Sequence, residues 1–239
     1  MKRITYHGVG EFKLPESWSE VTIKQFQEIE ALQIEKETER SLAYLEIFTG
    51  IKSEDLRALP FTDLLNLDKE IGFINSNNKA EIKYIIDVDG VKYGLQYDFT
   101  KMKTSEYIDF DTLVTSENVI GNIHAILALL YRPIVKDGKG KKDYKIEDYT
   151  SDNLMERAEI FREEMSVEIM LSAFTFLQAV VLDLSGNLSD FLTQTTKRTT
   201  AKKTKSPIKV SPSVGGGFLH SIRSAARTLF FKMLGSKKI

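Results

Sequence analysis

The chain has 239 residues, of which 42% are hydrophobic and 28% are charged, and it contains no cysteine. This composition is typical of a globular protein with a sizeable core, and the lack of cysteine excludes a disulfide framework and thiolate zinc sites. The chain does not start with a basic segment followed by an apolar one, and the apolar stretches 123–131 and 170–184 are short or interrupted by polar residues. We therefore expect no signal peptide, no transmembrane helix and a cytoplasmic setting.

The charge is divided unevenly along the chain. Eleven of the 33 basic residues follow Leu192, where no aspartate or glutamate occurs, and the 22 that precede this point are outnumbered by 34 acidic residues. The formal net charge of −1 therefore combines a body of about −12 with a tail of about +11.

The first part of the chain predicts a small strand pair followed by helices. Short extended apolar pieces with glycine between them end at Leu14. Thr22 and Gln25 have the spacing of a capping box, in which each side chain bonds a free amide of the first helical turn. The residues that then recur at helical spacing are Val21, Ile23, Phe26, Ile29 and Leu32.

Three further helices are expected before residue 76. The pattern over 37–48 predicts a helix that ends at Gly50, because glycine readily adopts the left-handed conformation of a helix end. Two short helices follow, with Ser53 and Thr62 as their predicted caps.

Residues 81–97 change to a β pattern. Two β-rich runs flank Asp89-Gly90, a dipeptide suited to the positive φ angles of a tight hairpin. Asp87 and Asp89 also suggest a calcium loop, but the spacing lacks the remaining oxygen ligands, so the hairpin is the preferred interpretation.

From Ser116 the chain returns to helix, which is expected to stop at Arg132-Pro133 because proline biases the residue before it away from helical angles. The lysines and glycines over 137–142 could form a phosphate cradle. However, this segment follows a helix and does not lead from a strand into one, so we interpret it as a solvated loop that only connects.

The last third combines a long helix, a linker and a second helix. An apolar pattern over 151–192 predicts a helical region broken near Met165-Ser166. Residues 193–217 are rich in Thr, Lys, Ser, Pro and Gly and predict a flexible basic linker. Residues 218–239 predict a basic amphipathic helix, whose apolar side is the candidate partner-binding surface: Phe218, Leu219, Ile222, Ala226, Leu229, Phe230 and Met233.

Together these elements predict an α+β fold that is mainly helical, with a small antiparallel sheet inserted and the C-terminal helix carried on the linker. The predicted domains are an acidic body over 1–192, the linker over 193–217 and the basic helix over 218–239. Limited proteolysis is expected to cut first between Thr193 and Gly217.

The sequence contains none of the familiar catalytic signatures. His7, His124 and His220 lie on separate elements, so they form no metal pair, and His124 fits a core or boundary position. No nucleophile elbow, phosphate loop or dinucleotide fingerprint is present. The clustered carboxylates near 109–111 and 163–168 fit a solvated face. We expect no enzyme activity, no cofactor and no metal.

The order of several segments resembles that in a family of tailed-bacteriophage proteins, the tail or baseplate assembly chaperones. The segments are LPESWSEVTIKQFQEI, EYIDFDTL, ALLYRPI, YKIEDY and RAEIFREEMSVE, and the resemblance covers about residues 12–192. It implies a mainly helical protein that binds a tape-measure or other tail component until assembly. It also implies that Tyr131, Arg132 and Pro133 form a structural corner, in which Arg132 pairs with Glu147 or Asp148.

The basic tail departs from this resemblance and leaves alternatives open. The chain could be a structural virion protein whose basic C-terminal arm docks on a neighbouring subunit or packaged nucleic acid. Self-association through the tail is a further possibility. Binding to nucleic acid or to a membrane surface could be driven by the tail, although the acidic body disfavours it. The protein is thus expected in the host cytoplasm during assembly, and in the virion if it is structural.

Overall fold

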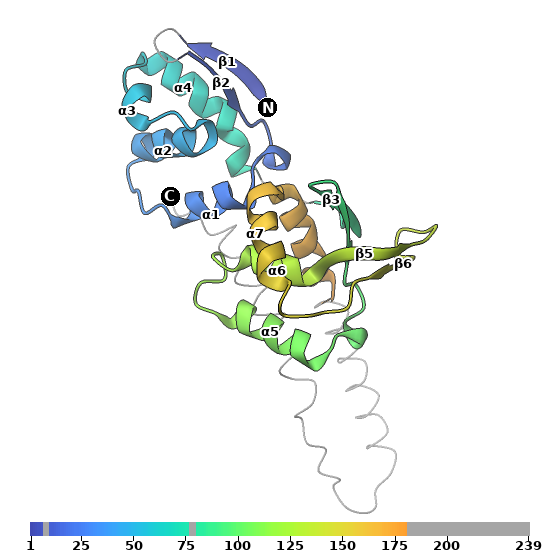
Figure 1. Ribbon diagram of the computed structural model, residues 1–239. Helices are drawn as coiled ribbons and strands as arrows, with labels where there is room; N and C mark the ends of the chain where they lie inside the picture. Colours follow the sequence, from blue (N-terminus) through green and yellow to red (C-terminus); the bar gives the residue numbers. More distant parts are fainter. Residues whose placement is uncertain (7–9, 77–79, 181–239) are drawn as a thin grey trace, which may run out of the picture.

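The computed structural model describes residues 1–6, 10–76 and 80–180, which form two lobes (Figure 1). We call residues 1–76 the first lobe and residues 80–180 the second lobe. The described chain is mainly helical and carries two small antiparallel sheets, as predicted. The predicted linker and C-terminal helix lie outside the described residues, as does the end of the predicted body.

The first lobe combines a strand pair with helices, and the predicted strand pair is confirmed. Its strands run antiparallel, with Lys2 opposite Leu14. Its elements are β1 (Lys2–Tyr6), β2 (Gly10–Leu14), η1 (Trp18–Glu20), α1 (Ile23–Ala31), α2 (Glu37–Thr49), α3 (Ser53–Leu56), α4 (Phe61–Glu70) and η2 (Ile71–Asn75).

Local signals determine where the helices of this lobe begin and end. The Thr22 hydroxyl accepts from the Gln25 amide and the Gln25 side chain accepts from the Thr22 amide, so the predicted capping box is confirmed. Gly50 ends α2 with a φ of 73°. The predicted caps Ser53 and Thr62 are wrong: their helices exist, but the N-caps are Lys52 and Pro60, and neither forms a side-chain cap bond.

Aromatic side chains fill the core of the first lobe. Trp18 meets both Phe26 and Phe73 edge to face, with ring centroids 6.0 and 5.4 Å apart, and Phe48 packs against Phe73. Edge-to-face packing places the positive ring edge on the negative ring face, so these contacts add to the gain from burying apolar surface.

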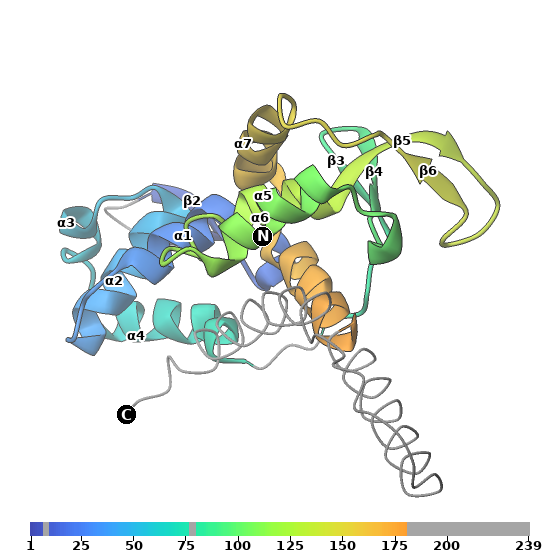
Figure 2. The same ribbon diagram turned by 90° about the horizontal axis from the view of Figure 1, so that it is seen from below.

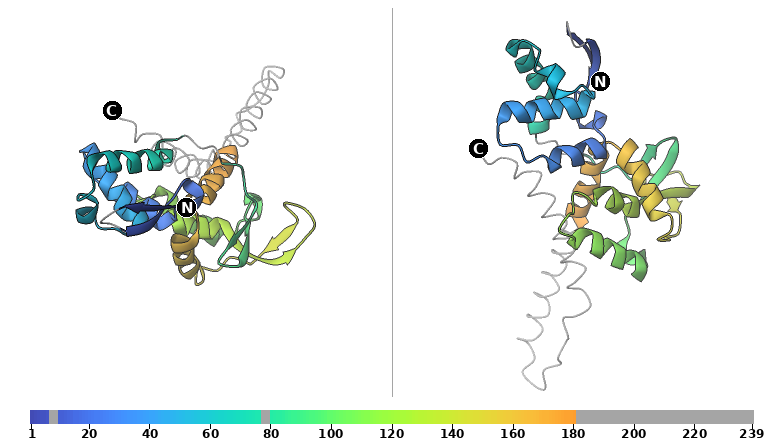
Figure 3. Two further views of the ribbon diagram at one scale, coloured as in Figure 1. Left: turned by 90° about the horizontal axis from the view of Figure 1, so that it is seen from above. Right: turned by 60° about the vertical axis from the view of Figure 1, so that its left-hand side comes forward.

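The second lobe places helices against a four-stranded antiparallel sheet with the order β3-β4-β5-β6 (Figure 2). The sheet lies on the side of this lobe that faces away from the first lobe (Figure 3). The elements are β3 (Ile85–Val88), β4 (Val91–Leu95), η3 (Phe99–Lys101), α5 (Thr104–Thr115), α6 (Ile123–Leu130), β5 (Tyr131–Asp137), β6 (Tyr144–Ile146), α7 (Leu154–Glu164) and the helical residues 167–180.

The hairpin predicted at Asp89-Gly90 is confirmed. The two residues have φ angles of 51° and 73° and join β3 to β4. The Asp87 carboxylate accepts from the Gly90 amide at 3.1 Å. This acidic side chain therefore stabilises the turn, which accounts for its place in the sequence without calcium.

The exposed loop predicted over 137–142 is confirmed for residues 138–143, but the strands β5 and β6 on either side of it were not predicted. Helix α6 ends at Leu130, and the chain passes directly into β5, which pairs with β4 through Tyr93 opposite Pro133 and Gly94 opposite Arg132. The Pro133 carbonyl accepts from the Glu147 amide at 2.8 Å. Proline lacks a donor but keeps its acceptor, so it stops the helix and still takes part in the sheet.

Helices in the second lobe differ from the prediction in two places. Helix α5 was not anticipated, because its buried positions Glu106, Phe110 and Val114 include a charged residue at a site where the helical pattern needs an apolar one. The helix expected from Ser116 begins only at Ile123, and turns occupy the residues between.

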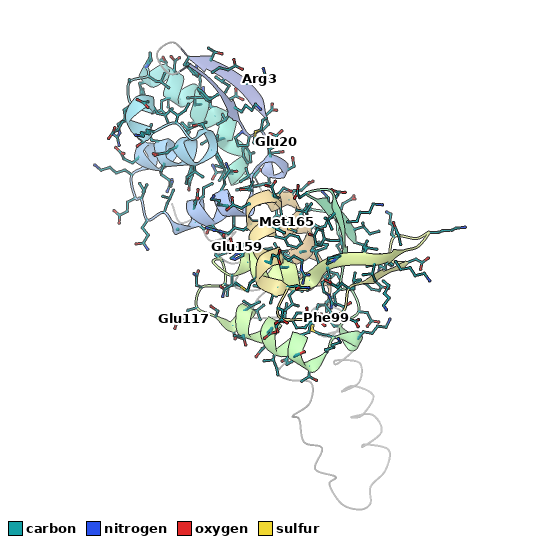
Figure 4. The ribbon with its side chains drawn as sticks, viewed as in Figure 1. Arg3, Glu20, Phe99, Glu117, Glu159 and Met165 are labelled. Carbon is teal, nitrogen blue, oxygen red and sulfur yellow. The ribbon has the colours of Figure 1, made fainter. Side chains whose placement is uncertain are left out.

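The two lobes meet at the break between α7 and residue 167, which confirms the predicted break near Met165-Ser166. The Ile23 amide donates to the Met165 carbonyl at 3.0 Å, and the Val167 amide donates to the Val21 carbonyl at 2.9 Å. Figure 4 shows Met165 at this boundary. The start of α1 thus satisfies backbone groups that the broken helix leaves free.

Candidate functional site

Segments that carry the family resemblance converge in the second lobe on a buried ion pair. Arg132 at the start of β5 places Nη2 3.1 Å from Oε1 of Glu106 on α5, and the two side chains are 5% and 1% exposed. The other Glu106 oxygen accepts from the Lys103 amide at 3.3 Å, at the amino end of α5. Glu106 thus caps its own helix and balances the charge of a strand residue.

The predicted partner of Arg132 is therefore wrong. Neither Glu147 nor Asp148 forms the ion pair with Arg132; burial lowers the pKa of Arg132, and the charges of Glu106, Asp148 and Glu147 oppose this shift. Glu147 instead lies 3.3 Å from Nη1 of Arg157, whose Nε donates to the Ala128 carbonyl at 2.9 Å. Glu147 and Asp148 follow Arg132 within 16 positions of the sequence, but in the folded chain Glu106 is the carboxylate that pairs with Arg132.

A tyrosine extends this network to a second carboxylate of α5. Tyr149, which follows Glu147 and Asp148, donates its hydroxyl proton to the Asp109 carboxylate. Burial is the main cause that raises the pKa of Tyr149, and the bond to Asp109 raises it further. We call these side chains the buried charged network: Glu106, Asp109, Arg132, Glu147, Tyr149 and Arg157.

Burial dominates the electrostatics of the network. Loss of water raises the pKa of the Glu106 carboxyl and lowers the pKa of the Arg132 guanidinium, and their mutual attraction opposes both shifts. Glu106 Oε1 and Arg132 Nε have no hydrogen-bond partner among the described residues, so the contact between the side chains is ionic and poorly aligned. Such a pair is costly to bury and more costly to break.

Tyr131 lies beside Arg132 in the strand and points to the other face of the sheet. Its ring is fully buried, and its hydroxyl donates to the Lys83 carbonyl at 2.7 Å. The Lys83 amide in turn donates to Ser172 Oγ at 2.6 Å. Tyr131, Arg132 and Pro133 therefore connect α6, the sheet and residues 167–180.

The network is enclosed at its centre and partly exposed at its edge, where the Glu147 side chain is 36% exposed. Its central pair is almost fully enclosed, and Arg157 is held by Glu147 and by the Ala128 carbonyl. Within 1–6, 10–76 and 80–180, no group of three or more histidine or acidic side chains could hold a metal ion. None of the helices in the same part of the chain has the length and apolar character needed to span a bilayer.

A polar junction joins the lobes beside this network. The Gln27 side-chain amide of α1 donates to the Ile120 and Gly121 carbonyls, at 2.9 Å each, and lies 3.0 Å from His124 Nδ1. The side-chain oxygen of Gln27, Oε1, accepts from Arg162 Nε at 3.2 Å. Burial lowers the pKa of His124, which favours the neutral ring at a boundary position.

The predicted loop is the turn of a basic hairpin, residues 134–146, whose sides are formed by β5 and β6. Tyr144 donates its hydroxyl proton to the Leu95 carbonyl at 2.7 Å, and Tyr97 donates to the Lys142 carbonyl at 3.0 Å. The Lys142 ammonium lies 4.4 Å from the centre of the Tyr84 ring, at cation–π distance. Tyr144 also covers Gly94, where a Cβ would lie 2.5 Å from its ring.

The hairpin could have been found from the sequence. Ile134 and Val135 precede Gly138 and Gly140, and Tyr144 to Ile146 follow them, which is the pattern of two short strands around a turn. The network, by contrast, had no local signal. The candidate partner-binding residues Phe218 to Met233 lie outside the described residues.

Comparison with protein-family models, with curated proteins and with solved structures finds no match to this chain.

Proposed function

We propose that this chain is a non-enzymatic protein of tailed-bacteriophage assembly that binds a tail component, such as the tape measure, in the host cytoplasm. The observation that carries the proposal is the convergence of four resembling segments on the buried charged network. EYIDFDTL supplies Glu106 and Asp109, ALLYRPI supplies Arg132, YKIEDY supplies Glu147 and Tyr149, and RAEIFREEMSVE supplies Arg157.

Convergence matters because a fortuitous resemblance has no reason to select residues that touch one another. These segments span more than 50 positions, and each provides a charged or polar partner that another segment needs. The network stabilises the lobe and leaves the surface to bind partners. The resemblance then describes a scaffold, which is consistent with a binding protein that performs no chemistry.

A second candidate function is a structural virion protein, which the charge asymmetry favours. A tail of about +11 on a body of about −12 can dock on an acidic neighbour or on packaged nucleic acid. The two functions differ in the fate of the protein, because a chaperone leaves the particle before it matures and a structural subunit stays.

Affinity purification of the full chain from infected cells, together with analysis of purified virions, tests both functions. The proposal expects a tail component in the purified complex and no copy of this chain in the virion. Stoichiometric presence in the virion selects the second candidate. If the purified complex contains no tail component and the virion contains no copy of the chain, both candidate functions are wrong.

A matched pair of full-length variants tests whether the apolar residues of 218–239 carry the binding. Replacing Ile222, Leu229 and Phe230 by Ser is expected to abolish capture of the tail component. The control replaces Ser221, Ser224 and Thr228 by Ala on the opposite side of the predicted helix and should bind normally. Equal binding by both variants contradicts the assignment of this surface.

A further inference from the structure

The basic hairpin, residues 134–146, projects from the second lobe (Figures 1 and 2). It contains five lysines and two aspartates. One of the aspartates, Asp137, places its Oδ2 3.4 Å from Nζ of Lys92 on β4. Strands β5 and β6 carry the hairpin out beyond the rest of the second lobe (Figures 1 and 2). Tyr144 bonds the Leu95 carbonyl, and Lys142 in the turn contacts Tyr97 and the Tyr84 ring, so the hairpin is presented in a defined position.

An exposed apolar side chain lies within this basic surface. Val135 is 59% exposed, between the sheet and the lysines of the hairpin. Val91, at the start of β4 in the adjoining strand, is 44% exposed. An apolar centre with a charged rim is the usual composition of a protein–protein contact, whereas a surface that binds only phosphates needs no apolar centre.

Helix α7 carries the complementary surface. Leu154, Arg157, Ala158 and Phe161 face the core, and the opposite side of the helix turns to solvent. Met155 is 57% exposed on that side, and the acidic residues around it are also exposed. We call this surface the acidic face: Asp152, Met155, Glu156, Glu159 and Glu163. Two of its carboxylates form exposed ion pairs within the chain, Glu163 with Lys24 and Glu159 with Arg162.

We propose that the basic hairpin of one copy of this chain docks on the acidic face of α7 in a second copy. The two surfaces match in charge, and each has one exposed apolar side chain, Val135 or Met155, among its charges. The hairpin leads away from α7 of its own chain in both Figures 1 and 2, so the contact requires another molecule. Charge complementarity selects the partner and the apolar pair is desolvated at the centre.

This association is independent of the proposed role in tail assembly and can be tested with the purified full chain. Sedimentation velocity at low ionic strength should show self-association that weakens as salt is raised, because the Debye length falls to about 3 Å at 1 M. A chain that stays monomeric at low salt up to high concentration overturns the proposal.

Charge reversal identifies the two surfaces. The hairpin variant Lys139→Glu/Lys141→Glu and the helix variant Asp152→Lys/Glu156→Lys should each remain monomeric, because like charges then face one another. Lys13→Glu/Lys36→Glu, at exposed sites of the first lobe, carries the same charge change as the hairpin variant and should associate like the unaltered chain. Melting temperatures establish that each variant is folded.

Mixing the two variants is the decisive step. The acidic hairpin of the first variant then matches the basic α7 surface of the second, so the mixture should associate although neither variant does so alone. All four substitutions in one chain should likewise restore association at unchanged net charge. If the mixture stays monomeric, or if only the helix variant loses association, the hairpin is not the occupant of the acidic face and the proposal is wrong.

Discussion

The two lobes differ in whether an ion pair lies in the core. In the first lobe the core is aromatic and aliphatic, and ion pairs lie at the surface, as in Arg57–Glu39, whose side chains are 51% and 40% exposed. In the second lobe the pair Arg132–Glu106 is 5% and 1% exposed and lies within the core. Two arginine–glutamate pairs therefore differ in how much stability is lost when one partner is removed. Water can solvate the remaining charge at the surface but not in the core.

The largest expected effect comes from breaking the buried pair. Arg132→Ala leaves the Glu106 carboxylate in an enclosed site without its cation, which should lower the free energy of unfolding by about 3–5 kcal/mol. For a chain of this size, the melting temperature should fall by roughly 10 °C. Thermal unfolding followed by circular dichroism measures this change.

A second substitution separates stranded charge from lost packing. Arg132→Ala/Glu106→Gln removes the uncompensated charge and should be more stable than Arg132→Ala alone, even though it contains one more change. A double variant no more stable than the single one would assign the loss to packing of the arginine side chain.

The pH dependence of Arg132→Ala sharpens the same comparison. Burial raises the pKa of Glu106 in the native state, so the stability that depends on this group is lost as pH rises through that pKa. Without Arg132 the native pKa of Glu106 rises further. The stability deficit of the variant should therefore be smaller near about pH 5 than near about pH 8, as measured by urea unfolding. A deficit independent of pH contradicts an electrostatic cause.

A smaller effect is expected at the junction of the lobes. Gln27→Ala removes bonds to Ile120, Gly121 and Arg162 and should cost about 1–2 kcal/mol, because water can reach part of this site. Hydrogen exchange should quicken in α1 and in residues 116–122. Gln33→Ala, at an exposed site beyond the end of α1, is the control and should change neither quantity.

The smallest effect is expected at the surface of the first lobe. Arg57→Ala breaks the exposed pair with Glu39 and should leave the melting temperature unchanged, since both side chains are hydrated without each other. A loss comparable to that of Arg132→Ala would show that the contrast between the lobes is not one of burial.

Short-range patterns in the sequence determined many of the local features. The Thr22 capping box, the turn at Asp89-Gly90 and the helix end at Gly50 each depend on residues within a few positions. These residues restrict the backbone angles or bond neighbouring amides directly, so their effect is present before the chain folds. The mainly helical fold class followed from the same patterns.

Tertiary structure alone decided how the charges pair. Glu106 on α5 reaches Arg132 across 26 positions, while Glu147 and Asp148, which are closer in the sequence, lie farther from its guanidinium. No local pattern in the sequence tells which of these carboxylates pairs with Arg132. The pairing depends on which carboxylate is buried when α5 packs against the sheet. The basic hairpin combines both levels, because a local pattern indicates its two strands and the packing of Tyr144 over Gly94 holds it against β4. Local preferences give each segment its conformation, and only the shared core determines which buried groups meet.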